Sequence, residues 1–400
     1  MTIPLAVSAA SYLLRASAFS KNALLRHQRQ RRHRLFASTL AVSTGVSRLT
    51  TLQTLLQHHG VPGSSGCTKG EGDMVPLLVA NSAEGDAPEL LESLEPRGSG
   101  GLYTNLHPYL VPLARSQSTG NIICAYRPLA LGGESTSTSP WPIVETKLGA
   151  PGMQLLALNS EHLMRRIVCA LDADSESDND TYIDLYNTDL GQGLLHDDLD
   201  TPYERGSVET LGYGVDKYVL LRVGPFPDIY ASLSQGHLAR GDEQSALIAA
   251  EAANTKLSGF GSQYRLYSRL LDTLGTSRTE EARDAARMCL RLPLATIGMD
   301  VADFEEVARL GQMVDPEVSN TADVALAKIS DMCTLMRQVE EKDPQKAEKS
   351  PEQVVAEEAD QMISDTILQQ EDWGSVRPKL GQLFRSAGHD ELAAFVELDQ

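Results

Sequence analysis

Aromatic residues are scarce in this chain of 400 residues, since Phe, Trp and Tyr together make up 5% of it. This scarcity argues against a platform that stacks nucleic-acid bases. A net charge of −19 also argues against nucleic acid as the main partner, because binding phosphates requires a basic surface. No uncharged apolar run reaches the roughly 18 residues of a transmembrane helix. The hydrophobic fraction of 42% predicts a globular chain with room for two or three domains.

Motifs that carry catalysis or bind metals are also missing from the sequence. There is no phosphate-binding P-loop, no HExxH and no GxSxG, and Gly212-Tyr213-Gly214 lacks the third glycine of a dinucleotide site. The five cysteines form no CxxC pair, which indicates isolated thiols in a reducing compartment. His58 and His59 are adjacent, so their side chains diverge on a helix and do not share a metal. We therefore predict no enzyme activity, no cofactor and no metal.

Acidic residues are absent from the first 70 positions, which hold nine basic residues, and the first carboxylate is Glu71. Residues 71–400 therefore carry 26 basic and 54 acidic residues, a net charge of −28. An Arg- and Ser-rich segment without acids has the composition of an organelle transit peptide. A basic tail on an acidic domain is the alternative interpretation.

The extreme amino terminus contains an uncharged apolar run, residues 3–14, followed by Ala16-Ser17-Ala18 and Phe19. Small residues at Ala16 and Ala18 suit signal peptidase. The arrangement is similar to the bipartite leaders of algae with complex plastids, which favours a plastid. No Lys or Arg precedes the apolar run, and this keeps a mitochondrial presequence open as the alternative. We expect residues 1–45 to be the targeting leader.

The segment between the leader and residue 205 gives weak signals. Gly, Ser, Thr and Pro dominate much of it, so we expect a low-complexity, largely disordered linker over residues 46–110. A small irregular domain over residues 111–205 should follow, with strands at 122–126 and 167–171. Its acidic run begins Asp172-Ala173-Asp174-Ser175-Glu176 but lacks the Gly and the final Glu of a calcium loop. We favour a solvated acidic loop. The alternatives are a loose cation site and an enzyme whose site contains Asp172, Asp174 and Asp178.

The second half is strongly helical and shows an internal period. A stripe of small residues at Ala246, Ala249, Ala250 and Ala253 recurs 36 residues later at Ala282, Ala285, Ala286 and Cys289. Partner helices are expected at 228–240 and 263–274, with Gly241 and Gly275 in the turns. The period is close to that of tetratricopeptide repeats, and a plain helical bundle is the alternative. We predict a helical-hairpin domain over residues 206–340, with a weaker third unit from Val301.

Residues 341–400 should form a carboxyl-terminal helical pair. Ser350 and Pro351 are typical of a helix start, with Ser as the cap and Pro in the first turn. A last hairpin follows around Gly388, and Trp373 is expected to fasten its entry. The predicted fold class is thus mainly α, with tetratricopeptide-like hairpins in the carboxyl-terminal half after a small irregular α+β or partly disordered region.

The most distinctive string is Val223-Gly224-Pro225-Phe226-Pro227-Asp228, which leads into the first hairpin. Two prolines hold it extended, and Asp228 is expected to cap the helix. A rigid helix entry that seats Phe226 in the core is favoured over a partner-binding loop.

Over about residues 201–396 the sequence resembles the chloroplast low-photosystem-II-accumulation factors of the third type. The resemblance depends on Gly214-Val215-Asp216-Lys217-Tyr218, on the string ending at Asp228, on Ala282-Arg283-Asp284-Ala285-Ala286-Arg287 and on Ala387-Gly388-His389. It implies a non-enzymatic protein of the stroma or the stromal face of the thylakoid. It further implies that the protein binds photosystem II core-antenna subunits and the thylakoid insertase, peripheral to the membrane.

An acidic helical-repeat surface suits basic loops of membrane subunits. The expected partner-binding residues lie around the first two hairpins: Tyr218, Arg222, Pro225, Phe226, Pro227, Asp242, Glu243, Glu280 and Glu281. The alternative function is an accessory helical-repeat subunit of a mitochondrial respiratory complex.

Overall fold

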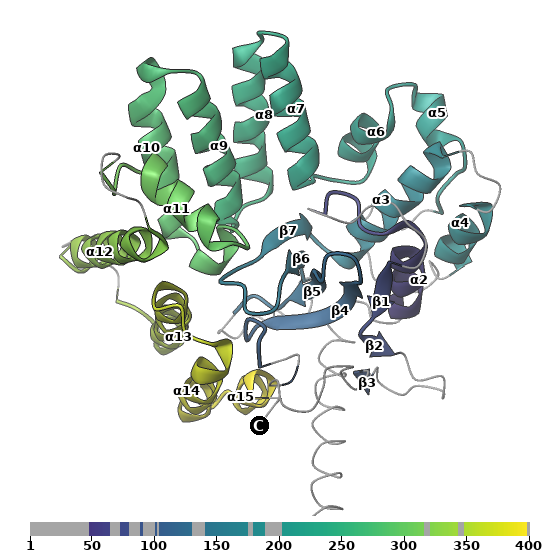
Figure 1. The fold of residues 1–400 in the computed structure, drawn as a ribbon. Helices are drawn as coiled ribbons and strands as arrows, with labels where there is room; N and C mark the ends of the chain where they lie inside the picture. The colour runs from purple at the N-terminus through teal and green to yellow at the C-terminus, as the bar shows by residue number, and fades with distance from the viewer. Residues whose placement is uncertain are drawn as a thin grey trace, which may run out of the picture.

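A five-stranded antiparallel sheet lies at the centre of the molecule, and helices surround it (Figure 1). The strands follow the order β1-β4-β5-β6-β7, so β4 to β7 form a meander and β1 adds to its open edge. Their bounds are β1 Met74–Pro76, β4 Leu110–Ser116, β5 Ile122–Tyr126, β6 Ile143–Thr146 and β7 Gln154–Ala157, and a separate pair is β2 Leu78–Val79 with β3 Glu89–Leu90. The computed structural model describes residues 48–64, 73–79, 89–90, 101, 104–129, 141–174, 179–188, 202–315, 321–342 and 348–397.

The three middle strands are buried almost throughout, which indicates cover on both faces of the sheet. Helix α3 packs against β7 and contacts four helices of the amino-terminal part. Helix α3 spans Ser160–Ala173, and the four helices that it contacts are α2 Leu49–His59, α4 Asn179–Thr188, α5 Ser207–Leu211 and α6 Val215–Arg222. A buried ion pair between Arg48 and Glu161, 2.7 Å apart, joins the start of α2 to α3.

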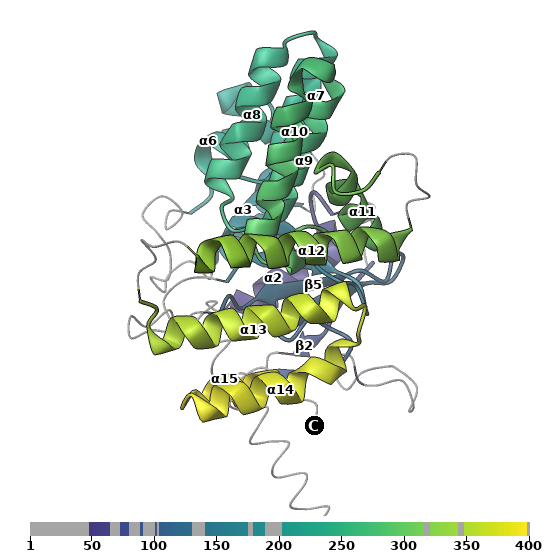
Figure 2. The same ribbon diagram turned by 90° about the vertical axis from the view of Figure 1, so that its left-hand side faces the viewer.

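Two helical hairpins stand side by side and project away from the sheet (Figures 1 and 2). They consist of α7 Pro227–Ala239 with α8 Glu243–Lys256, and α9 Gly261–Thr273 with α10 Thr279–Met288. Small residues such as Ala246, Ala250 and Ala282 are buried between the helices, as their spacing predicts. The same hydrogen bond recurs in both hairpins: the Ser234 hydroxyl donates to the carbonyl of Ala246, and the Ser268 hydroxyl to that of Ala282.

Of the remaining helices, α11 packs against the second hairpin, and α12 to α14 run across one side of the molecule (Figure 2). They are α11 Val301–Leu310, α12 Ala322–Glu341, α13 Pro351–Leu368, α14 Trp373–Ser386 and α15 Asp390–Val396, with short 3₁₀ turns at Thr276–Arg278, Cys289–Arg291 and Leu294–Thr296. Ser350 and Gln353 form a capping box at the start of α13, and Pro351 occupies its first turn, as predicted.

The carboxyl-terminal helices are hydrogen-bonded to the loops that flank the strands of the sheet. The indole nitrogen of Trp373 donates to the carbonyl of Ala150 at 2.9 Å, and the side chain is 3% exposed. Arg377 donates to the carbonyls of Leu106 and Val396, each at 2.9 Å. One continuous hydrophobic core therefore extends from α2 through the sheet to α15.

An aromatic cluster lies where the sheet meets these helices. The ring of His107 contacts those of Tyr109, Tyr126 and Trp373, and its Nδ1 accepts a hydrogen bond from the backbone N–H of Tyr109. Burial, with the nearby positive charge of Arg377, lowers the pKa of His107 to about 3. The imidazole is therefore neutral at physiological pH.

The mainly helical fold class is confirmed, and so are the helical hairpins of the carboxyl-terminal half. Strand β5 is found at the predicted place, whereas residues 167–171 belong to helix α3 and the prediction of a strand there is wrong. Apolar residues recur through α3 at helical spacing, and Asn159 caps it, so the short apolar string is the buried face of a longer helix. The predicted linker over 46–110 contains α2 and β1 to β3. The leader, residues 1–45, lies outside the described residues.

No helix among the described residues is long and apolar enough to cross a membrane.

Candidate interaction site

The two hairpins bring the predicted acidic residues to the same end of the molecule. Asp242 and Glu243 lie at the turn between α7 and α8, and Glu280 and Glu281 at the start of α10, both at the outer tips of the hairpins (Figure 1). All four side chains belong to exposed residues. We call these four residues the hairpin tips.

The carboxylates of the hairpin tips already have intramolecular roles. Asp242 caps α8 by accepting from the backbone N–H of Ser245, and it lies 3.3 Å from Nδ1 of His237. Hydrogen bonding by the side chain and the backbone of Ser245 lowers the pKa of Asp242. Glu280 pairs with Arg283, and Glu281 pairs with Arg278 at 2.7 Å. Acidic residues in the first turn also stabilise a helix, because their negative charge interacts favourably with the positive end of the helix dipole. The acidic residues of the hairpin tips therefore stabilise the hairpins themselves, in addition to any contact they make with a partner.

The proline-rich string forms the junction between the amino-terminal part and the hairpins. Phe226 is fully buried and Pro227 is buried, so neither has a surface for a partner in this structure, and Pro225 is half-buried. These residues seat the hairpins, as the rigid-entry interpretation expects. Asp228 does not cap α7, whose cap residue is Phe226 without a side-chain hydrogen bond.

Asp228 is instead bound by Arg166 of α3. Nη1 of Arg166 donates to Oδ1 of Asp228 at 2.7 Å, and Nη2 donates to Oδ2, a bidentate pair. The guanidinium also lies over the ring of Phe226, 4.6 Å from its centre. Gly63 approaches the same carboxylate so closely that a Cβ there would lie 2.6 Å from the Asp228 side chain. The junction thus joins three distant segments of the chain.

The two remaining predicted site residues, Tyr218 and Arg222, both lie on helix α6 but differ in exposure. Tyr218 is 9% exposed and packs edge-on against Tyr203, whereas Arg222 is exposed at the end of the helix. The outer side of α6 presents Leu221, which is 65% exposed, and Lys217, whose ammonium lies over the ring of Tyr213. Of this pair, only Arg222 is placed to contact a partner.

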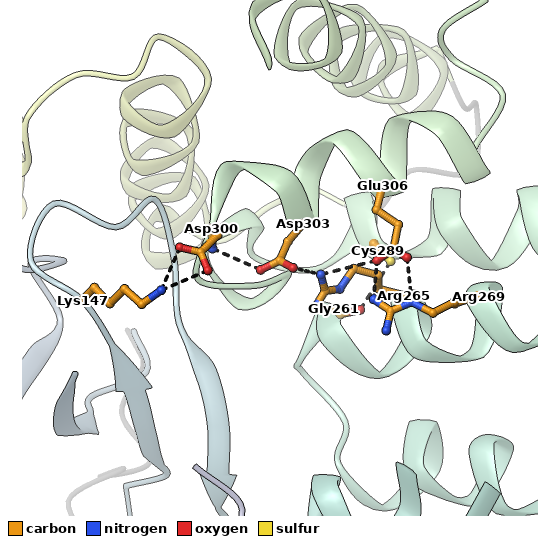
Figure 3. A network of polar contacts seen from close by, with 8 residues as sticks. All are labelled: Lys147, Gly261, Arg265, Arg269, Cys289, Asp300, Asp303 and Glu306. Carbon is orange, nitrogen blue, oxygen red and sulfur yellow. Dashed lines mark hydrogen bonds and ion pairs between the residues drawn. The ribbon is translucent and has the colours of Figure 1, made fainter. Parts of the chain in front are cut away.

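A ladder of ion pairs between α9 and α11 was not predicted from the sequence (Figure 3). Arg265 contacts Asp303 and Glu306, Arg269 binds Glu306 through two nitrogens, and Arg309 lies 3.3 Å from Asp272. Burial alone would raise the pKa of Glu306, but Arg269, Arg265 and Arg309 lower it. Lys147, in the turn before β7, binds both carboxylate oxygens of Asp300 and extends the network to the sheet. The partners on α9 and α11 lie 37 to 41 residues apart in the chain, so only the folded structure reveals them.

No group of three or more metal-binding side chains is found among the described residues. The acidic run begins inside α3 and its cap: Asp172 accepts hydrogen bonds from the Tyr203 hydroxyl and from the backbone N–H of Gly206. This carboxylate therefore anchors the start of α5 and is not part of a solvated loop. Asp178 lies outside the described residues. Cys124, Cys169, Cys289 and Cys333 are free thiols, and burial raises the pKa of each.

The helical part of the chain matches two known domain models. Residues 227–314, from the first residue of α7 to just beyond α11, match the PAB middle domain, and residues 329–399 match the PAB C-terminal domain. The protein IN CHLOROPLAST ATPASE BIOGENESIS, chloroplastic, of Arabidopsis thaliana is 30% identical to this chain over 264 residues, which are 64% of this chain and 72% of the relative. The chain therefore belongs to the family of this chloroplast biogenesis protein. No solved structure matches it.

Family membership supports part of the resemblance seen in the sequence. The class, a chloroplast biogenesis factor, is confirmed, but the relative's name concerns the chloroplast ATPase and not photosystem II. The tetratricopeptide-like interpretation of the hairpins and the division into domains stay predictions.

Proposed function

We propose that this chain is a non-enzymatic factor of the plastid that assists biogenesis of the chloroplast ATPase by holding its subunit polypeptides during assembly. The observation that carries the proposal is the family relationship, which covers 72% of a relative named for this process. The fold supports it, because stacked helical hairpins offer extended surfaces for polypeptides.

The hairpin tips and Arg222 are the predicted contact residues that remain exposed. An acidic end of a projecting pair of hairpins complements basic segments of a subunit and accelerates their encounter. Reversing the charge of Asp242 and Glu243, or of Glu280 and Glu281, is therefore expected to weaken binding. Glu209→Lys, which changes an exposed acid in the first turn of α5, is the matched control.

The direct test is to capture the carboxyl-terminally tagged protein from its own cells and identify the co-purifying chains by mass spectrometry. Enrichment of chloroplast ATPase subunits, reduced by the tip variants but not by Glu209→Lys, supports the proposal. Photosystem II core subunits or the thylakoid insertase in their place would support the narrower photosystem prediction and overturn the ATPase proposal. Subunits of a respiratory complex would overturn both the ATPase proposal and the photosystem prediction, and would indicate that the protein lies in the mitochondrion.

A further inference from the structure

Helix α12 carries an apolar stripe that is longer than the core that covers it. Ala325, Ile329, Met332, Met336 and Val339 follow each other at helical spacings of four and three residues. Ala325 and Ile329 are fully buried, the two methionines are half-buried, and Val339 is 64% exposed. The face that seats the first half of α12 in the core therefore continues over its second half, where Met332 and Met336 still pack against the core and Val339 is exposed.

Leu335 widens this stripe, since it lies four residues before Val339 and is 53% exposed. None of residues 330–341 is buried, although the helix continues to Glu341. The water-facing side of a surface helix is expected to be polar, so adjoining exposed apolar side chains such as Leu335 and Val339 mark a site of interaction. Methionine suits such a face because its flexible, polarizable side chain adapts to different partners.

The surroundings of the stripe are strongly acidic. Residues 331–342 and 348–360 contain eight carboxylates and three basic side chains. The carboxyl-terminal end of α12, where Glu340 and Glu341 lie, also carries the negative end of the helix dipole. Glu340, Glu341 and Glu358 are exposed and form no ion pair with another described residue, unlike Glu280 and Glu281 of the hairpin tips.

These features lie together at one side of the molecule. Helices α12 and α13 are in contact and run next to each other across the face seen in Figure 2. The side chain of Arg337 binds that of Gln361, which joins the second half of α12 to α13. We define the α12 surface as Met332, Leu335, Met336 and Val339 with the carboxylates of Glu340, Glu341 and Glu358.

We infer that the α12 surface is a docking site for a basic amphipathic helix of a client polypeptide. The apolar stripe accepts the apolar side of such a helix, and the surrounding carboxylates pair with its basic side chains. The same negative charge disfavours an anionic lipid surface. The inference deepens the proposed function, on which it depends for the client's identity, by naming the chemistry of the segment that is held.

The test measures binding of a fluorescent synthetic peptide to the full chain by anisotropy. The probe is an amphipathic helix of leucine, alanine and lysine, and its control is a scrambled peptide of the same composition and charge. The chain is expected to bind the amphipathic peptide about tenfold more tightly than the scrambled one. L335S combined with V339S should abolish this difference, and higher salt should weaken binding of both peptides.

The matched control is Ile248→Ser, which removes an apolar side chain of 58% exposure from α8 and should leave the difference intact. Because all three side chains are exposed, circular dichroism should show the same thermal unfolding for each variant. Equal binding of the two peptides, or equal loss in the Ile248→Ser variant, would overturn the inference. So would binding to anionic vesicles, or self-association that the double variant abolishes.

Repeating the capture experiment with the double variant separates the two proposals. If the wild-type chain captures ATPase subunits and the variant captures them equally, the docking site is wrong and the proposed function stands. If the wild-type chain captures none of them while the peptide measurement succeeds, the proposed function is wrong and the docking chemistry stands.

Discussion

The bidentate contact between Arg166 and Asp228 is the point where the hairpins join the amino-terminal part of the molecule. The side chain of Arg166 is 7% exposed and that of Asp228 is 32% exposed, so both charges are largely withdrawn from water. A charge in such a place is stable only when it is paired, because desolvation disfavours it.

Replacing Arg166 with Met should therefore lower the free energy of unfolding by about 2 to 3 kcal/mol, since it leaves the Asp228 carboxylate without its partner. Arg205→Met, which removes an exposed arginine paired with Asp180 and Asp184, should cost about 0.5 kcal/mol. Urea unfolding followed by circular dichroism measures both. If the two variants lose the same stability, the junction does not depend on this pair.

His107 makes stability depend on pH in a defined direction. Its folded-state pKa of about 3 is below the usual value of 6.5, so between these values the unfolded chain binds more protons. The contribution of His107 to the free energy of unfolding should therefore be greatest above pH 6.5. It should fall toward pH 3 with a slope of up to about 1.4 kcal/mol per pH unit.

Replacement of His107 by Asn tests this origin of the acid sensitivity. The Asn side chain keeps an acceptor for the N–H of Tyr109 two residues on, but it does not titrate. The variant should be less stable at neutral pH, because it loses ring contacts, and its stability should change less between pH 6.5 and pH 4. An unchanged pH slope would assign the acid sensitivity to other groups.

Among the elements, the helices from residue 227 onward could be predicted, whereas α2 to α6 and most strands could not. The helices predicted at 228–240 and 263–274 correspond to α7 and α9, and Ser350-Pro351 marks the observed start of α13. The two stripes of small residues lie in α8 and in α10 with the turn after it. Strand β4 was missed because Pro112 argues against a central strand. The structure accommodates Pro112 next to an irregularity, where the register with β5 shifts between Pro112 and Ala114. Likewise, the sequence located the hairpin tips but not their ion pairs, nor the ladder between α9 and α11.

The stripe of small residues lets the paired helices approach closely, so enlarging one of them should separate the helices. Ala250→Leu is expected to lower the free energy of unfolding by about 1 to 3 kcal/mol, because Ala250 is 1% exposed in the first hairpin. Ala239→Leu, at an exposed position of α7, should change it by less than about 0.5 kcal/mol. Thermal unfolding of both variants provides the measurement, and equal values would show that the stripe is not tightly packed.

At the scale of the whole molecule, the hairpins join the continuous hydrophobic core at their base. Phe226, Leu257 and Phe260 belong to that core, whereas Ala246, Ala250 and Leu270 form a small cluster of their own, as do Leu271, Ala282 and Ala285. Small separate clusters stabilise local structure less than a large continuous core does.

Hydrogen exchange should therefore be faster in the outer halves of α8 and α10 than in strand β5. Mass spectrometry of peptides from the exchanged protein measures this difference, with β5 as the internal reference. Protection that is equal in both would show that the hairpins open only when the whole molecule unfolds.

The attachment of α14 to the sheet has a consequence for how the chain is made. Trp373 and Arg377 close the core around carbonyls of Ala150 and Leu106, more than 200 residues earlier in the chain. During synthesis on the ribosome, those carbonyls and the aromatic cluster beside them are made long before the helices that cover them. The nascent sheet therefore completes its core only when the final helices have emerged, so the last tenth of the chain decides when this part of the molecule is closed to water.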